Sequence, residues 1–547
     1  MKINYNTNNY IENKEFKSKN KKKSNKLADY MLYEKNTFRK NHKHTEIHFG
    51  LAYPNIYKTA MSSLGYNILY NQLNERNDTW CERIIYPNTK TIESNTPMKH
   101  LDIISFTLQF EEDYFNVLKM LKEAEIPLKR KERGKEHPLI IAGGPCATAN
   151  PMPLSDYIDL FVIGEGEYIL NNILDTHLKN PDKNLKKFLE IPGVYISEYD
   201  NKTKIVLVED MENAYHITEP IISKSDDENY QTVFNNTIML NVSRGCMRGC
   251  RFCMSGYLYR PSRETCYEKL IDIAIQNRQN TGLNKVTLIG AAVSDYSNLE
   301  NLINGLEKNG FQISTPSLRI ESISKKTLQT LKESGLKTIT LAPESIPKLR
   351  KVINKDILDE TIFTVIKNAV ELDFKIKLYF LIGIPGENMN DIKELAEYLK
   401  KIAHMHYNIK NVKFSINTVI PKPHTPLQWE GYDFKDIKNK TRYLKKELKK
   451  YNIKCESPKK SMIQYILSCG NRGIGAIIEK TLTKTVTLKE WKEQLPNYQI
   501  DDELPWDNID VSVDKRFLKI EHSRLKNLKQ TPWCQTSPCY NCGACEK

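Results

Sequence analysis

Residues 246–253 read Cys246-Met-Arg-Gly-Cys250-Arg-Phe-Cys253, three cysteines in the spacing C-x3-C-x2-C, directly after the apolar segment Thr237-Ile-Met-Leu-Asn-Val. A cubane iron–sulfur cluster is normally bound by four cysteines. Three thiolates this close in the sequence can bind three of its irons and leave the fourth iron without a protein ligand. A structural zinc site or three unrelated buried cysteines are the alternatives. Zinc usually takes four ligands in paired spacings, and the nearest further cysteine is Cys266. The motif therefore predicts an iron–sulfur site with one iron free for another ligand.

This spacing, with Phe252 just before the third cysteine, resembles the signature of the radical S-adenosylmethionine superfamily. The resemblance implies a 4Fe-4S cluster on Cys246, Cys250 and Cys253 whose open iron chelates S-adenosylmethionine. It further implies that one electron splits S-adenosylmethionine into methionine and a 5′-deoxyadenosyl radical, which removes hydrogen from an unactivated carbon. An external one-electron donor of the flavodoxin or ferredoxin type is implied as well.

The segments after residue 237 alternate between short β-branched strands and amphipathic helices. Six strand–helix units fit a partial (β/α)6 barrel, in which chemistry gathers at the carboxyl ends of the strands, where the three cysteines lie. The strands are expected at 237–242, 285–289, 317–321, 337–341, 375–381 and 412–419.

Other strand ends of this barrel carry residues that, by the same resemblance, contact S-adenosylmethionine. The methionine amino group is expected at Gly290 and Ala291, where the family's usual Gly-Gly-Glu is changed and backbone carbonyls have to serve. The segment Ala342-Pro-Glu-Ser345 resembles one of related proteins, although Ile346-Pro347 departs from their Gly-Ser. The full set of expected contacts is Phe252, Gly290, Ala291, Glu344, Ser345, Lys355, Gly383 and Ile384. Surface salt bridges and ordinary turns are the alternatives, and no catalytic residue is assigned.

A different α/β pattern precedes the barrel. Short apolar strands near 47–53, 101–108, 138–144 and 159–164 alternate with helices, which indicates a parallel sheet covered on both faces. Its segments resemble the cobalamin-binding-type domain, a Rossmann-like fold, that precedes many radical S-adenosylmethionine domains. The loops that would hold cobalamin carry Gly143, Gly144, Gly164, Glu165 and Gly166. The Asp-x-His-x-x-Gly motif is absent, so the domain either binds cobalamin without a histidine ligand or is a scaffold.

The tail is a second cysteine cluster, Cys534, Cys539, Cys542 and Cys545. Four cysteines complete a site, and both zinc and an auxiliary 4Fe-4S cluster fit the ligand count. The dense C-x2-C-x2-C spacing favours iron–sulfur, with free reducible thiols as a third alternative.

These patterns predict a chain of several α/β domains. The expected segments are a disordered basic lead-in (1–44), a Rossmann-like domain (45–192), a linker (193–233), a radical S-adenosylmethionine barrel (234–430), a small helical cap (431–530) and a metal-binding tail (531–547).

The 547 residues contain no apolar run of about 18 residues and no apolar leader, so we expect a cytoplasmic protein without a membrane partner. The formal net charge of +14, with seven lysines in 14–26, fits a solvated surface or an RNA partner.

The sequence thus favours a radical enzyme whose substrate it does not name. Cobalamin-dependent methyl transfer is one expected reaction, and radical oxidation, rearrangement or thiolation without cobalamin, including on RNA, is the alternative. A non-catalytic iron–sulfur factor that binds RNA or the ribosome is a second alternative.

Overall fold

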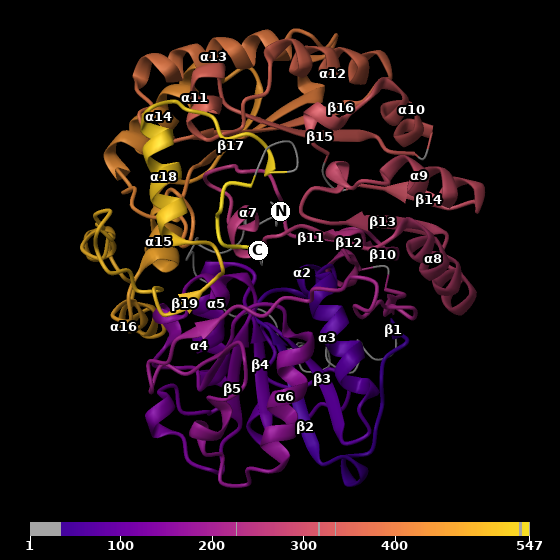
Figure 1. Ribbon diagram of the computed structural model, residues 1–547, viewed down its shortest axis with the longest axis vertical. Coiled ribbons are helices and arrows are strands. Elements are labelled where there is room, and N and C mark those ends of the chain that lie inside the picture. Colours follow the sequence, from indigo (N-terminus) through magenta and orange to yellow (C-terminus); the bar gives the residue numbers. More distant parts are fainter. Residues whose placement is uncertain (1–33, 226, 316–317, 334, 535–538, 546–547) are drawn as a thin grey trace, which may run out of the picture.

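The N-terminal half of the chain forms a six-stranded sheet in the order β3-β2-β4-β5-β6-β7. Its strands are β2 (Ile47–Tyr53), β3 (Thr79–Ile85), β4 (Ile103–Thr107), β5 (Leu139–Gly143), β6 (Leu160–Val162) and β7 (Val194–Tyr195). All neighbours are parallel except β7, which runs antiparallel to β6. This computed structural model describes residues 34–225, 227–315, 318–333, 335–534 and 539–545 (Figure 1).

Helices cover both faces of this sheet, because its strands are apolar on both sides. The helices are α3 (Leu64–Glu75), α4 (Tyr114–Glu123), α5 (Pro145–Ala149) and α6 (Gly166–Leu178). Phe49 and Leu51 belong to the core under α3 and α6, whereas Ile104 and Phe106 belong to the core under α4. The expected Rossmann-like layers are confirmed. Strand β3 was not predicted, because its buried charged residues Glu82 and Arg83 interrupt the apolar pattern.

Two parallel sheets of three and four strands form the barrel half. The first holds β10 (Ile238–Asn241), β13 (Lys285–Ile289) and β14 (Gln312–Ser314); the second holds β15 (Thr338–Glu344), β16 (Lys375–Ile382), β17 (Val412–Thr418) and β18 (Asn452–Cys455). The outer helices are α8 (Tyr267–Thr281), α9 (Leu299–Lys308), α10 (Lys325–Glu333), α12 (Asp359–Glu371), α13 (Met389–Ala403) and α14 (Phe434–Glu447), which arch over the strands in Figure 1.

Two expectations for the barrel are wrong. The third strand lies at Gln312–Ser314, where Ile313 is buried and pairs with Val286, whereas Ile320–Ser322 is a 3-10 helix. Residues 434–455, expected in the cap, instead form a seventh helix–strand unit, because β18 pairs in parallel with β17. Buried Leu444 of α14 and half-buried Ile453 of β18 pack into the core that the second barrel sheet shares.

The described part of the expected lead-in, residues 34–44, and the expected linker both contain paired strands. Within the expected lead-in, β1 (Glu34–Lys35) pairs antiparallel with β9 (Ile222–Ser223) of the expected linker, and buried Glu34 binds Arg83 of β3. The linker's β8 (Thr203–Lys204) pairs in parallel with β19 (Ile509–Asp510). The two strands of each pair are far apart in the sequence, so composition alone did not reveal the pairing and indicated segments without a fold. The lysines of 14–26 lie outside the described residues.

The remaining C-terminal helices are α15 (Pro458–Cys469), α16 (Ile474–Lys480), α17 (Leu488–Lys492) and α18 (Lys515–Lys526). Helix α16 contacts α4 of the N-terminal half, and α15 contacts α14 of the barrel half. The amide of Asn150 donates to the carbonyls of Ser468 (3.0 Å) and Gly470 (2.8 Å), and the hydroxyl of Tyr157 donates to Gly475 (2.9 Å). These helices therefore join the two halves of the molecule. None of the described helices combines the length and the apolar character needed to cross a membrane.

Candidate active site

The three cysteines Cys246, Cys250 and Cys253 lie on the loop after β10, at the carboxyl end of the first barrel strand. We call residues 246–253 the cluster loop. Gly245 directly precedes the cluster loop. Its φ of +78° suits glycine, and an added Cβ there would lie 2.0 Å from the Tyr259 carbonyl oxygen. Two short paired strands, β11 (Ser243–Arg244) and β12 (Arg263–Glu264), bracket the loop. The backbone therefore fixes where the cysteines start.

Burial and neighbouring thiols raise the pKa of Cys246 and Cys250 and so disfavour their thiolate forms. Burial and the neighbouring Cys253 and Cys250 raise the pKa of Cys246 to about 11. Burial also raises the pKa of Cys250, against the opposing effect of Arg319 and Lys355. Since thiolates are the ligand form, binding of iron here must release protons.

The described residues contain no group of three histidine, cysteine, aspartate or glutamate side chains that a single metal ion could hold. The thiolates of a zinc site lie about 4 Å apart, as a tetrahedron with bonds of about 2.3 Å requires. A cubane instead uses one thiolate for each iron, which needs a wider spacing. The choice of an iron–sulfur cluster over zinc for the cluster loop stays a prediction from its C-x3-C-x2-C spacing.

Arg319 is a site residue that the sequence analysis missed. Its guanidinium lies beside the Cys250 thiol, donates to Glu321 Oε1 (2.8 Å), and lies 3.9 Å from Asp295 Oδ2. Asp295 also accepts two hydrogen bonds of 2.9 Å from Arg248 of the cluster loop. An isolated arginine after a short strand gives no motif, so only the fold could find it.

A pocket of about 280 Å³ opens beside the first cysteine. Its lining includes Cys246 and Met247 of the cluster loop, Ala292 and Asp295 after β13, and Trp533 of the tail. Gly290 and Ala291, expected at the methionine amino group, are half-buried at this same strand end. Gly290 packs tightly against β11, since an added Cβ would lie 2.7 Å from Ser243 Oγ. The structure thus brings these two residues to the rim that holds Cys246.

Glu344 and Ser345 lie at the carboxyl end of β15, and Lys355 forms an ion pair with Glu344. Lys355 Nζ lies 3.0 Å from Glu344 Oε1, and both side chains are largely buried. Glu344 follows an irregularity in the pairing of β15 with β16 and has a φ of +70°, a strained value of the kind found at functional sites. In the described part of the chain, Glu344 Oε2 and the Ser345 hydroxyl are buried without a hydrogen-bond partner. Such orphaned polar atoms fit a site for a hydroxyl-bearing ligand.

Gly383 and Ile384 lie at the carboxyl end of β16. Gly383 has a φ of +77°, and its N–H donates to Glu387 Oε1 (2.8 Å), which also contacts Lys440 Nζ (3.0 Å). The Ile384 side chain is buried in the barrel core, and half-buried Phe252 packs against that core. Only backbone groups of Gly383 and Ile384 are therefore suited to contact an adenine ring.

Arg350 follows β15 and His424 follows β17, and both side chains are buried. Arg350 is buried and donates to the Ser345 carbonyl (2.7 Å) and to Asp359, so it braces the helix α11 (Pro347–Val352). Burial lowers the pKa of His424 to about 4, so its imidazole is neutral near neutral pH.

The glycine turns of the N-terminal sheet close onto the chain itself. Gly144 has a φ of +101° and an added Cβ would lie 2.7 Å from the Leu108 carbonyl oxygen, while at Gly164 (φ +114°) the Val206 carbonyl oxygen would lie at 2.1 Å. At Gly143 and Gly166 the nearest atoms to an added Cβ belong to Val162 and Leu69, at 3.3 and 3.4 Å. On the side of the missing side chain these glycines pack against the chain itself, and their role in binding cobalamin stays a prediction.

Glu165 contacts β11 and β12, the two short strands that bracket the cluster loop. Its carboxylate accepts hydrogen bonds from Arg263 at 2.9 and 3.1 Å and from the Val208 N–H at 2.6 Å, and it lies 3.3 Å from Arg244. Glu167 holds Arg244 at 2.7 Å. Because Arg244 and Gly245 directly precede Cys246, this loop of the N-terminal sheet fixes the entry of the cluster loop.

The tail cysteines lie near α18 and Arg260. Cys542 is buried, with its sulfur 3.8 Å from Arg260 Nη1, whereas Cys534 is half-buried and Cys539 and Cys545 are exposed. The sulfurs act on one another electrostatically: Cys542 and Cys539 raise the pKa of Cys545 alongside burial, and Arg260 opposes this. Residues 535–538 lie outside the described part, and the metal at this site stays a prediction.

Two family models match the chain. The model described as the radical SAM superfamily covers residues 240–399, which include the cluster loop, and the model described as radical SAM proteins, N-terminal, covers residues 65–197.

Known proteins of similar sequence or structure agree with these models. An uncharacterized protein of Methanocaldococcus jannaschii is 32% identical over 467 residues, or 84% of this chain and 98% of that protein. The GTP 3′,8-cyclase of Aquifex aeolicus is 29% identical over 174 residues, 30% of this chain and 53% of the cyclase. The structure of the radical S-adenosylmethionine methyltransferase TsrM from Kitasatospora setae, with cobalamin and a 4Fe-4S cluster bound, superposes with a TM-score of 0.51 at 13% identity, covering 71% of this chain and 78% of TsrM. This last likeness concerns the fold.

Proposed function

Because the chain belongs to the radical S-adenosylmethionine superfamily, we propose that Cys246, Cys250 and Cys253 hold the 4Fe-4S cluster of this enzyme and that the barrel rim holds S-adenosylmethionine. The observation that carries the proposal is the meeting of three thiols, two cations and orphaned polar atoms at one barrel rim. When bound, the cluster supplies one electron that splits S-adenosylmethionine into methionine and a 5′-deoxyadenosyl radical.

Different rim residues would bind different parts of S-adenosylmethionine. Arg319 supplies a positive charge beside Cys250 that pairs with the methionine carboxylate, and carbonyls after Gly290 accept from the ammonium group. Glu344 Oε2 and the Ser345 hydroxyl accept from and donate to the ribose hydroxyls, which ends their burial without partners. Lys355 holds the Glu344 carboxylate in place through their ion pair.

The chain also excludes water from this rim. Trp533 of the tail and Met247 of the cluster loop close one side of the pocket, and the Arg248–Asp295 ion pair lies across it. A shielded site protects a carbon radical from side reactions, which is the protein's main contribution in such chemistry. The radical removes one hydrogen atom from a substrate C–H bond, leaving 5′-deoxyadenosine and a substrate radical.

The step after hydrogen removal is methyl transfer, oxidation, rearrangement or thiolation. Cobalamin binding at Gly143, Gly144, Gly164 and Gly166 stays a prediction, since the chain itself packs beside Gly144 and Gly164 and two arginines hold Glu165. We therefore derive no step through cobalamin. The tail cysteines would hold an auxiliary 4Fe-4S cluster, because four cysteines lie close together in the sequence and one of them, Cys542, lies beside the cation Arg260.

The first experiment is anaerobic reduction of the reconstituted protein with dithionite in the presence of S-adenosylmethionine, with 5′-deoxyadenosine measured by mass spectrometry. We expect 5′-deoxyadenosine from the wild type and none from Cys250→Ala. Parallel samples with and without hydroxocobalamin report whether cobalamin changes the product. An intact cluster that never yields 5′-deoxyadenosine, with or without substrate extracts, would favour the RNA-binding factor over the enzyme.

A further inference from the structure

The inner face of the second barrel sheet carries three lysines. Leu378 of β16 and Phe414 of β17 belong to the core under the outer helices. Because side chains alternate along a strand, the residues next to them point to the opposite face, into the barrel. Lys377 of β16, Lys413 of β17 and Lys454 of β18 occupy such positions, and we call them the lysine cluster.

The pairing of the strands brings these lysines together. Lys377 is the partner of Lys413 in the parallel register, and Lys454 is the partner of Ser415, two residues along β17 from Lys413. Neighbouring strands lie about 4.8 Å apart, and two residues of a strand span about 7 Å. Burial, together with the charges of Lys413 and Lys454, lowers the pKa of half-buried Lys377. The three ammonium groups are therefore close enough to meet on one ligand.

No acidic side chain neutralises the lysine cluster within the part of the chain that the structure describes. Lys400 of α13 and Lys440 of α14, on the outer helices, each form an ion pair. By contrast, no described carboxylate lies within 4.0 Å of an ammonium group of the lysine cluster. The Lys377 ammonium group instead lies 4.9 Å from the centre of the Tyr379 ring. Like charges on neighbouring strands repel, and a bound anion would relieve that repulsion.

Ser415 adds an unpartnered hydroxyl to the same face. Its side chain is 3% exposed, and its hydroxyl is buried without a hydrogen-bond partner among the described residues. A buried hydroxyl without a partner lowers the stability of the fold. Lysine ammonium groups only donate hydrogen bonds, and a hydroxyl can donate one more. These donors together suit an anion with several acceptor oxygens.

The lysine cluster lies below the barrel rim, on the side of the sheet that faces the reaction. Strand β17 ends at Thr418, so Ser415 and Lys413 lie three and five residues, or roughly 10 and 17 Å, from that end. Figure 1 shows α7 (Ser255–Leu258), which follows the cluster loop, inside the arch formed by the outer helices. A small molecule with its anionic end at the lysine cluster therefore has its other end near the rim.

We propose that the lysine cluster and Ser415 bind the phosphate group of the substrate, so that this enzyme acts on a phosphorylated small molecule whose far end receives the radical at the rim. A phosphate monoester carries a charge of about −1.5 to −2 and three strong acceptor oxygens, which match three ammonium groups and a hydroxyl. This inference deepens the proposed function and rests on it, because it names the class of substrate.

The first test measures the affinity of phenyl phosphate for the anaerobically reconstituted full chain by calorimetry, with phenol as the ligand that lacks the phosphate. The variants are Lys377→Gln, the triple variant Lys377→Gln/Lys413→Gln/Lys454→Gln, and Ser415→Ala. The control variant carries Lys446→Gln, Lys449→Gln and Lys450→Gln, which remove the same charge from exposed positions in and after α14.

We expect the dissociation constant to rise about tenfold in Lys377→Gln, at least about a hundredfold in the triple variant, and severalfold in Ser415→Ala. The control should bind as the wild type, and salt should weaken binding in both. The unfolding midpoint of the triple variant should equal or exceed that of the wild type, because it loses a repulsion. A lower midpoint would show that the lysines support the fold and would overturn their assignment to a ligand.

The second test asks whether the substrate itself carries the phosphate. A small-molecule cell extract is divided, and one half is treated with alkaline phosphatase, which is then removed by filtration. Each half is added to the protein with dithionite and S-adenosylmethionine, and 5′-deoxyadenosine is measured. We expect the untreated extract to raise the yield and the treated extract to have no effect. Equal yields with the two extracts would overturn the inference.

The outcomes separate this inference from the proposed function. Equal affinity for phenyl phosphate in the triple variant and the control would overturn the inference, while formation of 5′-deoxyadenosine would still support the radical function. Tighter binding of a short single-stranded RNA, lost in the triple variant alone, would overturn the assignment to a small molecule. Phosphate binding by a chain that never forms 5′-deoxyadenosine would overturn the proposed function and, with it, the phosphate as part of a substrate.

Discussion

The carboxylate of Glu165 and the guanidinium of Arg263 form a two-point ion pair, with N–O distances of 2.9 and 3.1 Å and both side chains about nine-tenths buried. Glu165 belongs to the N-terminal sheet, and Arg263 belongs to β12 beside the cluster loop. The pair therefore joins the two halves of the molecule at the active-site rim.

Glu165→Gln should destabilise the folded chain by about 3–5 kcal/mol, because it leaves the buried guanidinium of Arg263 without its counter-charge. Denaturant unfolding followed by circular dichroism measures the effect. Glu125→Gln is the control, since it removes an exposed pair with Lys99 and should leave the midpoint unchanged. Equal midpoints for the two variants would contradict the role of Glu165.

The wild type should bind about eight irons after anaerobic reconstitution, four for each of two cubanes. Cys250→Ala and Cys542→Ala should each retain about four, since each removes one ligand set. Cys266→Ala should retain all, because this exposed thiol faces Glu212 rather than the cluster loop. Iron and zinc analysis decides the matter, and about four irons with one zinc in the wild type would exclude an auxiliary cluster.

Glu344→Gln should weaken S-adenosylmethionine binding about tenfold without loss of iron, because a charged acceptor for the ribose is replaced by a neutral one. Equilibrium dialysis with the reconstituted protein measures the dissociation constant. Lys348, four residues after Glu344, is half-exposed and pairs with Asp391. The control variant Lys348→Ala should bind S-adenosylmethionine normally. Unchanged affinity in Glu344→Gln would remove this residue from the site.

Gly245→Ala should abolish iron binding at the cluster loop although every cysteine is intact. Its φ of +78° and the Tyr259 carbonyl oxygen at 2.0 Å from an added Cβ leave no room for a side chain. Gly282 has nearly the same φ, +76°, but no atom lies within 4 Å of an added Cβ there. Gly282→Ala therefore measures the effect of backbone strain without a steric clash. We expect normal iron content in Gly282→Ala, and normal content in both variants would show that the loop entry is adaptable.

The stability of the chain should fall as the pH rises from about 4.5 to about 7 through the titration of Glu82. Burial raises the pKa of this carboxyl to about 7, so the folded state keeps a proton that the unfolded state releases above pH 4.5. Glu82→Gln, which cannot ionise, should therefore be more stable than the wild type at pH 8 by up to about 3 kcal/mol. The exposed-site control Glu123→Gln should follow the wild type at every pH, and an unfolding midpoint of Glu82→Gln below the wild type at pH 8 would contradict the assignment.

The fold class and the rim were accessible from sequence because they rest on local signals. The apolar segment before Cys246 and the alternating strands identified the parallel sheets and the end of β10. Strand β3 escaped because Arg83 is neutralised by Glu34 and Glu93, which no local pattern shows. Strand β18, with the sequence Asn-Ile-Lys-Cys, is too short and polar to stand out before its pairing with β17 is known.

The parts of the site that escaped prediction are contacts between distant segments. Glu165 and Arg263 are 98 residues apart, so their pairing follows only from the stacking of the two halves. Gly144 and Gly164 were expected to approach a ligand, and they approach Leu108 and Val206 instead. A glycine turn indicates close approach of a partner without revealing which partner it is.

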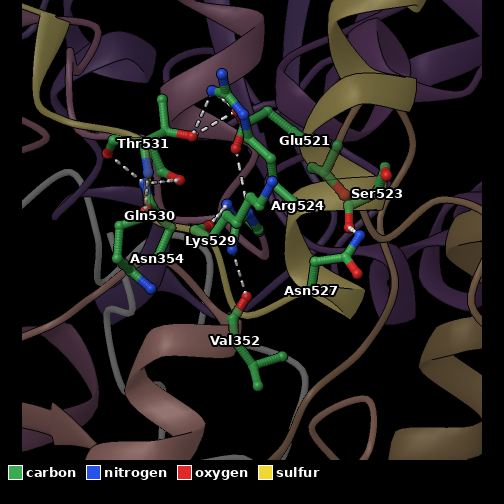
Figure 2. Close-up of polar contacts among 12 residues, drawn as sticks. Val352, Asn354, Glu521, Ser523, Arg524, Asn527, Lys529, Gln530 and Thr531 are labelled. Carbon is green, nitrogen blue, oxygen red and sulfur yellow. Dashed lines mark hydrogen bonds and ion pairs between the residues drawn. The ribbon is translucent and has the colours of Figure 1, made fainter.

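The segment 529–533, whose Lys529 carbonyl (Figure 2) accepts a hydrogen bond from Arg251 of the cluster loop, also matters for the biosynthesis of this protein. Lys529 follows Cys246 by 283 residues, and the tail cysteines come later still. At about 5–20 residues per second, a ribosome needs roughly 15–60 seconds to cover this distance, during which the N-terminal sheet can already fold. The three thiols therefore leave the ribosome well before the segment that holds their loop in place, and iron loading into a stable site has to wait until translation is nearly complete.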